Sequence, residues 1–450
     1  MNIEDILKKA IESLSSIPRS TTVRVVSHYD TDGATAAAIL CKALYRRGYD
    51  FHATLLKHPF EQELSKINEE NNDFIIFSDM GSGQIELIRK FDCPSIIIDH
   101  HQPIINEPIV DSTIQINANL VGFDGNYEAS GSSVSYLFAK TLDKKNKDLS
   151  PLALTGAIGD KQHLGGFSGL NRIIFEEAIA DGFIKVEKGK LKIGDKSLAE
   201  EISYSVDPYY TSLSGRERNV EKFLKEISIE SNKRYNDLSI AERKKLHSAL
   251  VLKLLENKLQ PEIIDAVIKD RYISNDLPDD LDRFSDVIDA CGKSGETGLA
   301  LAISLGDREK YIQAKDVERG HRKLLIEHLK VLEEDGELKE SKNIQYFYSP
   351  KASIGSVLSG IVMNYFPYKD KPTFSFSVKD DGTIHVSCRA TRFLVSKGLD
   401  LGEVMRKVAS KLDCKGGGHK IAAGGTIRGI NKEELISLID KQIELQMGGA

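Results

Sequence analysis

Acidic residues and histidines gather directly after short apolar segments in the first third of the chain. The set consists of His28, Asp30, Asp32, Asp79, Asp99, His100, His101 and Asp160. Carboxylates that are crowded together repel one another and lose solvation, so a cation is needed to neutralise such a cluster. Carboxylate and imidazole ligands without cysteine suit Mn²⁺ or Mg²⁺ better than a structural zinc ion. The pattern therefore predicts a divalent metal site, and two neighbouring ions would activate water for attack on phosphorus.

Each member of this set has a simpler explanation when it is taken alone. A single aspartate after an apolar segment, such as Asp79 or Asp160, is commonly a helix N-cap. A histidine pair such as His100 and His101 is commonly exposed, or hydrogen-bonded inside a core. The D-x-D-G sequence of residues 30–33 fits a turn as well as a metal site. The coincidence of four such segments in one region favours the metal site.

The elements that must position these residues are short apolar runs that alternate with helical segments. Strands are predicted at residues 22–27, 51–56, 73–78 and 95–98, and helices at residues 33–47, 60–71 and 84–90. This alternation is typical of a parallel sheet with helices on both faces, where ligands bind outside the carboxyl ends of the strands. Residues 152–159 are one more apolar run, so we expect Asp160 to follow a strand end as well.

The pattern divides the chain into three parts. Residues 1–165 are expected to form an α/β domain with a parallel sheet and the metal site at its strand ends. Residues 166–342 are expected to form a helical connector or insertion, because apolar residues recur there at three- and four-residue spacing. Alternation returns in residues 343–450, which predict a second, smaller α/β domain. Its strands are expected at 345–348, 373–378 and 383–388, and its helices at 354–364, 400–411 and 431–446.

A glycine-rich cluster near the C-terminus reads K-G-G-G-H-K over residues 415–420. The glycines would let the backbone approach an anionic ligand closely, with N–H groups and His419 as donors. Arg389 and Arg392, at the end of a predicted strand, could pair with phosphates. A glycine-rich turn without any ligand explains the cluster equally well. It is not a Walker A loop, because the G-K-[ST] ending is absent.

Composition adds expectations about compartment and partners. Sixty-one Lys and Arg against 67 Asp and Glu give a formal charge of −6, which by itself counts mildly against nucleic acid. The first 16 residues predict an amphipathic helix rather than a signal peptide, and no apolar run approaches the roughly 18 residues of a membrane span. Five scattered cysteines are typical of a reduced, cytoplasmic protein. We therefore expect a cytoplasmic protein without a membrane partner.

The ordered motifs resemble those of a known family. H-Y-D-T-D-G at residues 28–33, Asp79, D-H-H at residues 99–101 and Asp160 resemble, in order, the four motifs of the DHH phosphoesterase superfamily. G-G-G-H-K-I-A-A-G at residues 416–424 is similar to the signature of its DHHA1 C-terminal domain. Within the superfamily the chain is most similar to archaeal-type RecJ-like single-strand exonucleases. Further similar stretches lie at 156–162, 207–216, 290–292 and 398–402.

The resemblance implies a role for each residue. The implied ligands of two divalent ions, with Mn²⁺ favoured over Mg²⁺, are His28, Asp30, Asp32, Asp79, His100 and Asp160, and Asp79 would bridge the ions. His101 would contact a non-bridging phosphate oxygen, and Asp99 would orient a ligand. The implied residues that hold the nucleotide end of the substrate are Ser387, Arg389, Gly417, Gly418 and His419.

The function implied is a metal-dependent exonuclease that hydrolyses phosphodiester bonds of single-stranded DNA or RNA, in DNA replication or repair. The complete set of acids argues against catalytically inactive relatives. One alternative is an oligoribonuclease or cyclic-dinucleotide phosphodiesterase of the same superfamily, although the long helical segment distinguishes this chain from compact nano-RNA-degrading relatives. Another is a mainly structural replisome subunit that binds GINS or helicase components. Metal ions that neutralise the local acids would reconcile the −6 charge with a nucleic-acid substrate.

Overall fold

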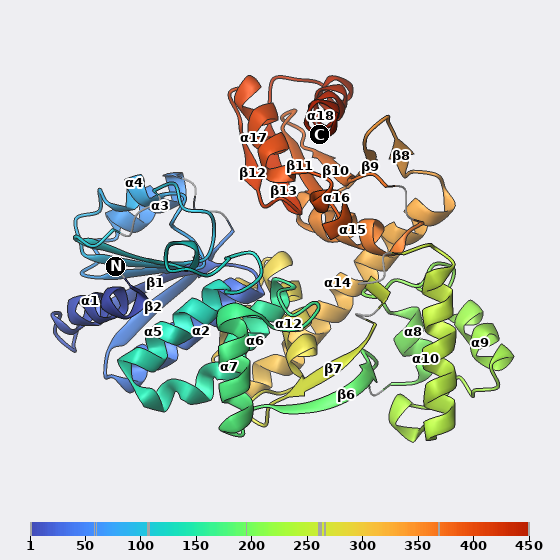
Figure 1. The fold of residues 1–450 in the computed structure, drawn as a ribbon, viewed down its shortest axis with the longest axis horizontal. Coiled ribbons are helices and arrows are strands. Elements are labelled where there is room, and N and C mark those ends of the chain that lie inside the picture. Colours follow the sequence, from blue (N-terminus) through green and yellow to red (C-terminus); the bar gives the residue numbers. More distant parts are fainter. Residues whose placement is uncertain are drawn as a thin grey trace. The chain divides into compact units, whose positions relative to one another are not determined.

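The structure is a computed structural model that describes residues 2–57, 59, 61–105, 109–194, 196–259, 263–264, 267–367 and 370–448. The chain forms two units, the first from residues 1–189 and 270–319 and the second from residues 190–269 and 320–450 (Figure 1). The segment expected as a helical connector is therefore shared between the units. The domain boundaries at residues 165 and 342 remain predictions.

The first unit is built on a five-stranded sheet in the order β2-β1-β3-β4-β5, with all of its strands parallel. The strands are β1 (Thr22–His28), β2 (Asp50–Leu56), β3 (Ile75–Ser78), β4 (Ser95–Asp99) and β5 (Thr113–Asn117). The central strands β3 and β4 are buried along their whole length. Helices cover both faces of such a sheet, which explains why these strands are continuous apolar runs rather than alternating ones.

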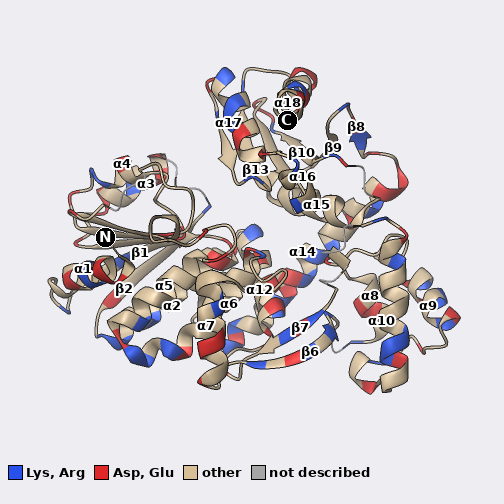
Figure 2. Ribbon diagram, in the orientation of Figure 1, with Lys and Arg blue, Asp and Glu red and all other residues tan. Residues whose placement is uncertain are grey.

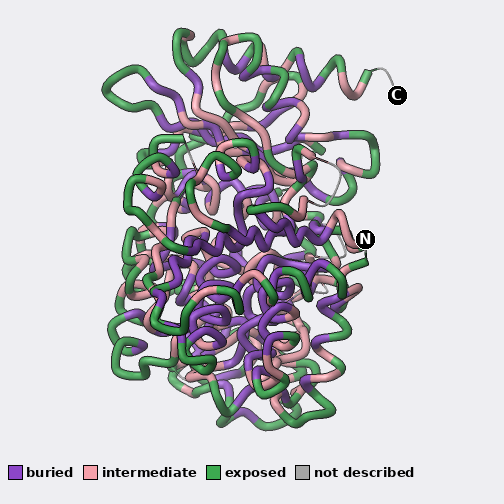
Figure 3. Tube along the Cα trace, turned by 90° about the vertical axis from the view of Figure 1, so that its left-hand side faces the viewer, coloured by how far each residue is buried: buried purple, intermediate pink, exposed green. Residues whose placement is uncertain are grey.

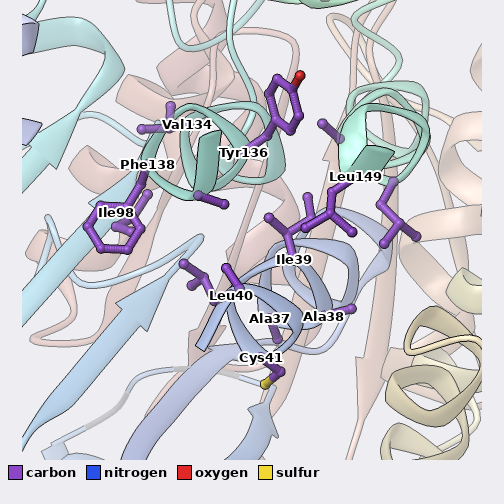
Figure 4. Packing of buried hydrophobic residues seen from close by; sticks show 14 of the residues in the cluster. Ala37, Ala38, Ile39, Leu40, Cys41, Ile98, Val134, Tyr136, Phe138 and Leu149 are labelled. Carbon is purple, nitrogen blue, oxygen red and sulfur yellow. The ribbon is translucent and has the colours of Figure 1, made fainter. Parts of the chain in front are cut away.

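Helices on the two faces of this sheet belong to two separate core clusters. On one face lie α1 (Ile3–Ser15), α2 (Thr31–Arg46), α5 (Gly131–Leu142) and α6 (Ser150–Gly159), and on the other lie α3 (Glu61–Glu69) and α4 (Ile85–Ile88). The first of these clusters centres on α2, whose side chains Ile39 and Leu40 meet those of α5 (Figure 4). Small residues between 34 and 38 allow α2 to pack closely against the sheet, α5 and α6.

The remaining elements of the first unit come from both of its chain segments. They are α7 (Gly169–Ala180), α12 (Leu281–Lys293), α13 (Thr297–Ser304) and the start of α14 (Arg308–Glu334). A two-stranded sheet joins β6 (Lys185–Leu191) to β7 (Ile268–Ile273). Helix α12 packs against α2 and α6, and its residues Phe284, Ile288 and Cys291 are fully buried in the same core as α2.

The second unit combines a helical segment with a six-stranded sheet in the order β12-β13-β11-β10-β9-β8. Its helices are α8 (Leu198–Ser203), α9 (Glu217–Glu226), α10 (Ile240–Leu255), α15 (Ala352–Tyr365), α16 (Arg392–Ser396), α17 (Leu401–Lys411) and α18 (Lys432–Met447). Its strands are β8 (Lys339–Glu340), β9 (Gln345–Tyr348), β10 (Thr373–Val378), β11 (Ile384–Arg389), β12 (Lys415–Gly418) and β13 (Ala422–Ile427). One core contains α8, α9, α10 and α15, and another contains α17 and α18.

The predicted fold class is confirmed, because a parallel-sheet domain, a helical segment and a separate smaller α/β part are all present. Buried and exposed stretches alternate along the chain, and exposed residues gather at its outer turns and loops (Figure 3). Basic and acidic residues are interspersed along the long helix α14 (Figure 2). Among the residues that the structure describes, no helix combines the length and apolar character needed to cross a membrane.

Candidate metal centre

Three neighbouring strands deliver candidate ligands to one edge of the sheet. His28 is the last residue of β1, Asp79 directly follows β3, and Asp99 ends β4 with His100 and His101 next in the chain. The strands are in register at this edge, because Ser27 pairs with Ser78 and Ser78 pairs with Ile98. The carboxyl ends of β1, β3 and β4 therefore bring these side chains side by side, as predicted.

Asp30 and Asp32 lie at the start of α2, directly after β1. Asp30 is the N-cap, and its Oδ1 accepts a hydrogen bond of 3.1 Å from Gly33 N–H. Asp30 is therefore a helix cap, a role that was considered for Asp79 and Asp160, whereas a turn was considered for residues 30–33. Asp30 also approaches His28 Nδ1 to 2.8 Å with its other oxygen. Gly33 is required here, because a Cβ on it would lie 2.3 Å from the carbonyl oxygen of His28.

The expectation that Asp160 follows a strand is wrong. Residues 150–159 form helix α6, and Asp160 is its C-cap. The run is apolar on all sides because α6 is buried between α2, α5 and α12, and a buried helix and a buried strand have the same short apolar sequence signal. Asp160 still reaches the cluster, with its Oδ2 3.4 Å from His100 Nε2.

The predicted ligand side chains meet in three overlapping groups. In each group one potential ligand atom from every member lies within 4.8 Å of the others. The groups are His28–Asp30–Asp79, Asp32–His100–Asp160 and Asp79–His100–His101. All six side chains predicted as metal ligands, and His101 beside them, are thus brought together by the fold.

Asp32 is held by the N-terminus of a helix that sequence reasoning did not assign to the site. Its two carboxylate oxygens accept hydrogen bonds of 2.6 Å from Gly131 N–H and 3.0 Å from Ser132 N–H, at the start of α5. A helix N-terminus favours negative charge, so it stabilises the carboxylate of Asp32. The only signal in the sequence is a glycine in G-S-S, and a Cβ on Gly131 would lie 2.7 Å from the Cβ of Asp79.

Gly156 is a second residue that the centre requires. It faces Asp32 from helix α6, and a Cβ there would lie 2.4 Å from Asp32 Oδ1 and 2.1 Å from Ser132 Oγ. No other residue type fits this position without moving Asp32. The sequence offered one signal for this role of Gly156, namely a glycine within an apolar run that otherwise favours a helix or a strand.

His100 presents a defined nitrogen to the acids. Its Nδ1 lies 2.6 Å from the carbonyl oxygen of Gly125, which only accepts hydrogen bonds, so Nδ1 carries the proton. Its Nε2 lies 3.1 Å from Asp79 Oδ1, 3.4 Å from Asp160 Oδ2 and 3.7 Å from Asp32 Oδ2. Three carboxylates face this one ring nitrogen, so positive charge is needed here, supplied either by a bound cation or by a proton on Nε2.

Three acids and two histidines of the cluster have strongly shifted pKa values. Burial raises the pKa of Asp32 to about 6, with a further contribution from Asp79. Burial, followed by Asp32, also raises the pKa of Asp160 well above its usual range. Burial opposes ionisation of Asp79 too, but contacts with His100 and His28 hold its pKa far below the ordinary value. For His28 and His100 burial lowers the pKa, but the facing carboxylates outweigh burial and raise it well above normal.

These residues fit a divalent cation. His28 Nδ1 and Asp79 Oδ1 are buried without a hydrogen bond among the described residues, although each has a charged group nearby. These potential ligand atoms lie close together but lack hydrogen bonds. A cation that binds them at the same time would compensate for the lost hydration. A mixed set of carboxylate oxygens and imidazole nitrogens suits Mn²⁺ and similar ions.

Asp99 and His101 form a pair beside the cluster. Asp99 is fully buried, and its Oδ1 lies 2.8 Å from His101 Nδ1 while its Oδ2 accepts a 2.9 Å hydrogen bond from Ser82 N–H. Burial would raise the pKa of Asp99, but His101 outweighs it, and the pKa lies far below the usual range. The side chain of His101 is 41% exposed, which makes it the more accessible of the two consecutive histidines.

The predicted substrate-binding residues belong to the second unit, whereas the acidic cluster belongs to the first. Ser387 and Arg389 are alternate residues of β11 and therefore lie on the same face of its sheet. Ser387 pairs with Gly424 of β13, and Gly424 pairs with Gly417 of β12. Because Gly424 and Gly417 are glycines, the positions that pair with Ser387 across β13 and β12 carry no side chain.

The glycine-rich segment is a strand, where a loop or turn was expected. Residues 415–418 form β12, and His419 begins the connection to β13 with its N–H donating to Ala422 O at 2.8 Å. Gly418 has a φ of +134°, and a Cβ on Gly402 of α17 would lie 2.2 Å from the oxygen of Gly418. The glycines therefore serve the close packing of α17 on this hairpin, in addition to any ligand.

Three family models match consecutive parts of the chain. The DHH family, N-terminal domain, matches residues 22–158, the DHH-CID domain matches residues 194–268, and the DHHA1 domain matches residues 343–445. The first match contains every candidate metal ligand except Asp160, and the third contains all five candidate substrate-binding residues.

Relatives and solved structures extend this likeness over the whole chain. An uncharacterized protein of Methanocaldococcus jannaschii, MJ0831, is 34% identical over 430 residues, which cover 94% of both chains. Thermus thermophilus RecJ in complex with Mn²⁺ has a TM-score of 0.60 at 17% identity; 99% of this chain is covered, but it spans only 55% of that RecJ chain. A manganese-bound exonuclease RecJ has a TM-score of 0.55 at 17% identity, covering 98% of this chain and 94% of the other. Entamoeba histolytica CDC45 has a TM-score of 0.66 at 13% identity, covering 98% and 99%.

Proposed function

We propose that this chain, which belongs to the DHH/DHHA1 family of RecJ-like proteins, is a metal-dependent exonuclease acting on single-stranded nucleic acid. The observation that carries the proposal is the convergence of acids and histidines from β1, β3, β4, α2 and α6 on one point. The residues assigned as ligands of two divalent ions are His28, Asp30, Asp32, Asp79, His100 and Asp160.

Asp79 is assigned as the ligand shared between the two ions. Its Oδ2 faces His28 Nδ1 at 3.6 Å and its Oδ1 faces His100 Nε2 at 3.1 Å, so the two oxygens of this carboxylate point toward different histidines. Water activation and neutralisation of phosphate charge are the chemistry that bound divalent cations supply. Mn²⁺ is the favoured ion and Mg²⁺ the alternative, in keeping with the mixed donor set.

His101 is assigned to the substrate phosphate. Asp99 fixes the ring through Nδ1 and is itself anchored by Ser82, so the imidazole has one defined orientation. Nε2 of His101 is the atom that would contact a non-bridging phosphate oxygen and stabilise charge that develops there. Asp99 acts on the substrate only through His101 and through its hydrogen bonds to the adjacent backbone N–H groups of residues 100 and 101.

The second unit is assigned to the nucleotide end of the substrate. Arg389 supplies a guanidinium for a phosphate, and Ser387 supplies a hydroxyl on the same face of the sheet. The side-chain-free row at Gly424 and Gly417 would allow close backbone approach to a base or a sugar. His419 adds a donor at the end of β12.

One time course tests this function. Strands of DNA and of RNA, labelled at the 5′ or the 3′ end, are incubated with the chain in Mn²⁺ and in Mg²⁺. Stepwise shortening should occur with the wild type and disappear in Asp79→Asn. Asp181→Asn is the control. Asp181 is the C-cap of α7, just as Asp160 is the C-cap of α6, but Asp181 pairs with Lys147 away from the cluster. Cleavage that persists in Asp79→Asn would exclude the assigned centre, and cleavage of very short oligomers alone would favour an oligoribonuclease.

A second candidate is a subunit of the replicative helicase assembly, which binds GINS or helicase components. The likeness to CDC45 over nearly the full length of both chains favours it. A scaffold of this kind does not need the acids, so Asp79→Asn should recover the same partners as the wild type from a cell extract. Recovery of no replication protein by either form would count against this role. The two candidate roles are compatible, since an active nuclease can also be part of an assembly.

A further inference from the structure

A continuous network of buried hydrogen bonds joins two candidate metal ligands, Asp32 and His100, behind the cluster. It passes through residues that are assigned neither as metal ligands nor as substrate contacts, on the loop before α5, on α5 itself, after α6 and on α7. Its members are Gly125, Ser130, Ser132, Ser133, Gln162 and Asn171, all of which are buried.

From His100 the network begins at a backbone carbonyl. The oxygen of Gly125 accepts from His100 Nδ1 at 2.6 Å and also from Gln162 Nε2 at 3.0 Å. Gln162 Nε2 also donates to Ala129 O at 3.3 Å, so this one side chain bonds to both ends of the loop of residues 125–129. Asn171 Nδ2 then donates to Gln162 Oε1 at 2.6 Å, which fixes the orientation of the glutamine amide.

From Asn171 the network returns to Asp32. Ser133 Oγ donates to Asn171 Oδ1 at 2.5 Å, and the N–H of Ser133 donates to Ser130 Oγ at 3.3 Å. The Ser130 hydroxyl in turn donates to Ser132 Oγ at 2.8 Å, because Ser132 Oγ itself donates to Ala153 O. The N–H of Ser132 donates to Asp32 Oδ1. Asn171 therefore links the loop that orients His100 to the helix start that orients Asp32.

Asp160, the third member of the same candidate group, is attached through the chain itself. Gln162 follows it by two residues, and the N–H groups of both turn back onto α6, at Gly156 O and Ala157 O. By contrast, the side-chain contacts described for His28 and Asp30 do not join the network, and Asp79 meets it at His100, whose Nε2 lies 3.1 Å from Asp79 Oδ1. The network thus directly supports the Asp32–His100–Asp160 group, whereas His28 and Asp30 of the other group lie outside it.

We propose that Gln162 and Asn171 are positioning residues that set the cation affinity of the Asp32–His100–Asp160 group separately from that of the His28–Asp30–Asp79 group. The physical reason is that the Gly125 carbonyl fixes the proton on His100 Nδ1 and aims Nε2 at the acids. Loss of such an outer hydrogen bond typically weakens metal binding by about 10- to 100-fold. This inference rests on the metal site of the proposed function but not on nuclease activity.

The test is a titration of the full chain with Mn²⁺ alone, followed by calorimetry and by the electron paramagnetic resonance signal of the free ion. Asp160→Asn and Asp30→Asn identify which binding event belongs to which group. In Asn171→Leu, which removes both amide hydrogen bonds, the event lost in Asp160→Asn should weaken about 10- to 100-fold. The event lost in Asp30→Asn should keep its wild-type affinity.

Thr113→Val is the matched control. Thr113 is buried in the same sheet and its hydroxyl lies 3.0 Å from Ser95 Oγ at the opposite end of β4 and β5, so the variant also loses a buried hydrogen bond. It should lose stability without a change in either binding event, whereas a general loss of packing would affect both variants alike. Ser133→Ala deletes one hydroxyl of the network, adds no bulk, and should weaken the same event by a smaller factor. It decides the question if Asn171→Leu does not fold.

Three results would overturn the proposal. The first is wild-type affinity for both ions in Asn171→Leu, or in Ser133→Ala where only that variant folds. The second is an equal loss in both events, which would indicate a general structural effect. The third is binding of a single Mn²⁺ ion by the wild-type chain. Absence of nuclease activity in the wild type would contradict the proposed function alone and leave the titration meaningful.

Discussion

Asp79 Oδ1 lies 3.1 Å from Nε2 of His100, and both side chains are almost completely buried. Two further carboxylates approach the same nitrogen, from Asp160 at 3.4 Å and from Asp32 at 3.7 Å. Without a cation such a cluster is costly, since each ionised group loses its hydration. The cluster should therefore link the stability of the first unit to divalent metal.

Addition of Mn²⁺ to metal-free protein should raise the melting temperature. At about one hundred times the Kd, a ligand of the native state adds about 2.7 kcal/mol, which is a rise of about 5–10 °C for a unit of this size. Asp79→Asn should lose most of the rise, and Asp181→Asn should retain it. Differential scanning calorimetry in EDTA and in Mn²⁺ measures both, and an equal rise in the two variants would speak against the centre.

Gly156→Ala should damage the centre, and Gly298→Ala should not. Both glycines lie in helices of the first unit, but a Cβ on Gly156 would lie 2.4 Å from Asp32 Oδ1, whereas a Cβ on Gly298 meets no atom within 4 Å. Overpacking should cost Gly156→Ala about 1–3 kcal/mol and lower its Mn²⁺ affinity. Gly298→Ala should be neutral or gain up to about 1 kcal/mol. Chemical denaturation with a Mn²⁺ titration checks both, and equal behaviour would disprove the assigned packing.

Arg389→Gln should weaken binding of single strands without affecting Mn²⁺. If the guanidinium contacts one phosphate, its loss should reduce the slope of log affinity against log salt by about 1. Arg428→Gln is the control at the other end of the same strands, where Arg428 Nε donates to Thr383 Oγ1 at 3.1 Å. Fluorescence anisotropy at several salt concentrations gives the slopes. An unchanged slope in Arg389→Gln would remove Arg389 from the interface.

Glu70 should contribute stability that depends on pH. Arg24, which is 3% exposed, donates to Glu70 Oε2 at 2.6 Å, and this hydrogen bond lowers the pKa of Glu70. A lowered pKa stabilises the fold above the unfolded value of about 4.3, and the contribution is lost as the pH falls through the folded value. Glu70→Gln should thus be less stable than the wild type at pH 7, and the difference should shrink toward pH 3.

Urea denaturation at several pH values measures this difference. Glu69→Gln, at the exposed last position of α3, is the neighbouring control and should differ little from the wild type throughout. A difference for Glu70→Gln that stays constant from pH 7 to pH 3 would show that the ion pair contributes nothing through its charge.

The elements that could be predicted from the sequence are those that a short stretch of residues encodes. Strands β1, β3 and β4 were predictable because buried parallel strands are continuous runs of apolar residues, and the acids at their ends follow directly. Helix α6 was assigned as a strand because its short apolar run has no periodicity to distinguish the two. Strand β12 was missed because three consecutive glycines disfavour a strand, and their role in the close packing of α17 on the hairpin depends on contacts that the sequence does not show.

Other parts of the centre could not be predicted, because they depend on contacts between distant residues. Gln162 and Asn171 are single polar residues near helix ends, and nothing in their neighbours indicates that they meet in a buried network. Asp32 meets Gly131 across 99 positions of sequence. Such pairs follow from how helices pack on the sheet, which no single segment of sequence encodes.

The first unit is built from two separate segments of the chain, and this has a consequence for its biosynthesis. Thr31 Oγ1, next to the candidate ligands, donates to Ser285 O of α12, which lies 254 positions later in the chain. A Cβ on Gly292 of α12 would lie 2.1 Å from the carbonyl oxygen of Tyr29, so α12 packs closely against the turn that carries Asp30. A ribosome releases every candidate ligand long before it releases α12. We therefore expect the centre to mature late in biosynthesis, and a fragment that ends at residue 189 to leave part of the unit's core exposed to solvent and to proteases.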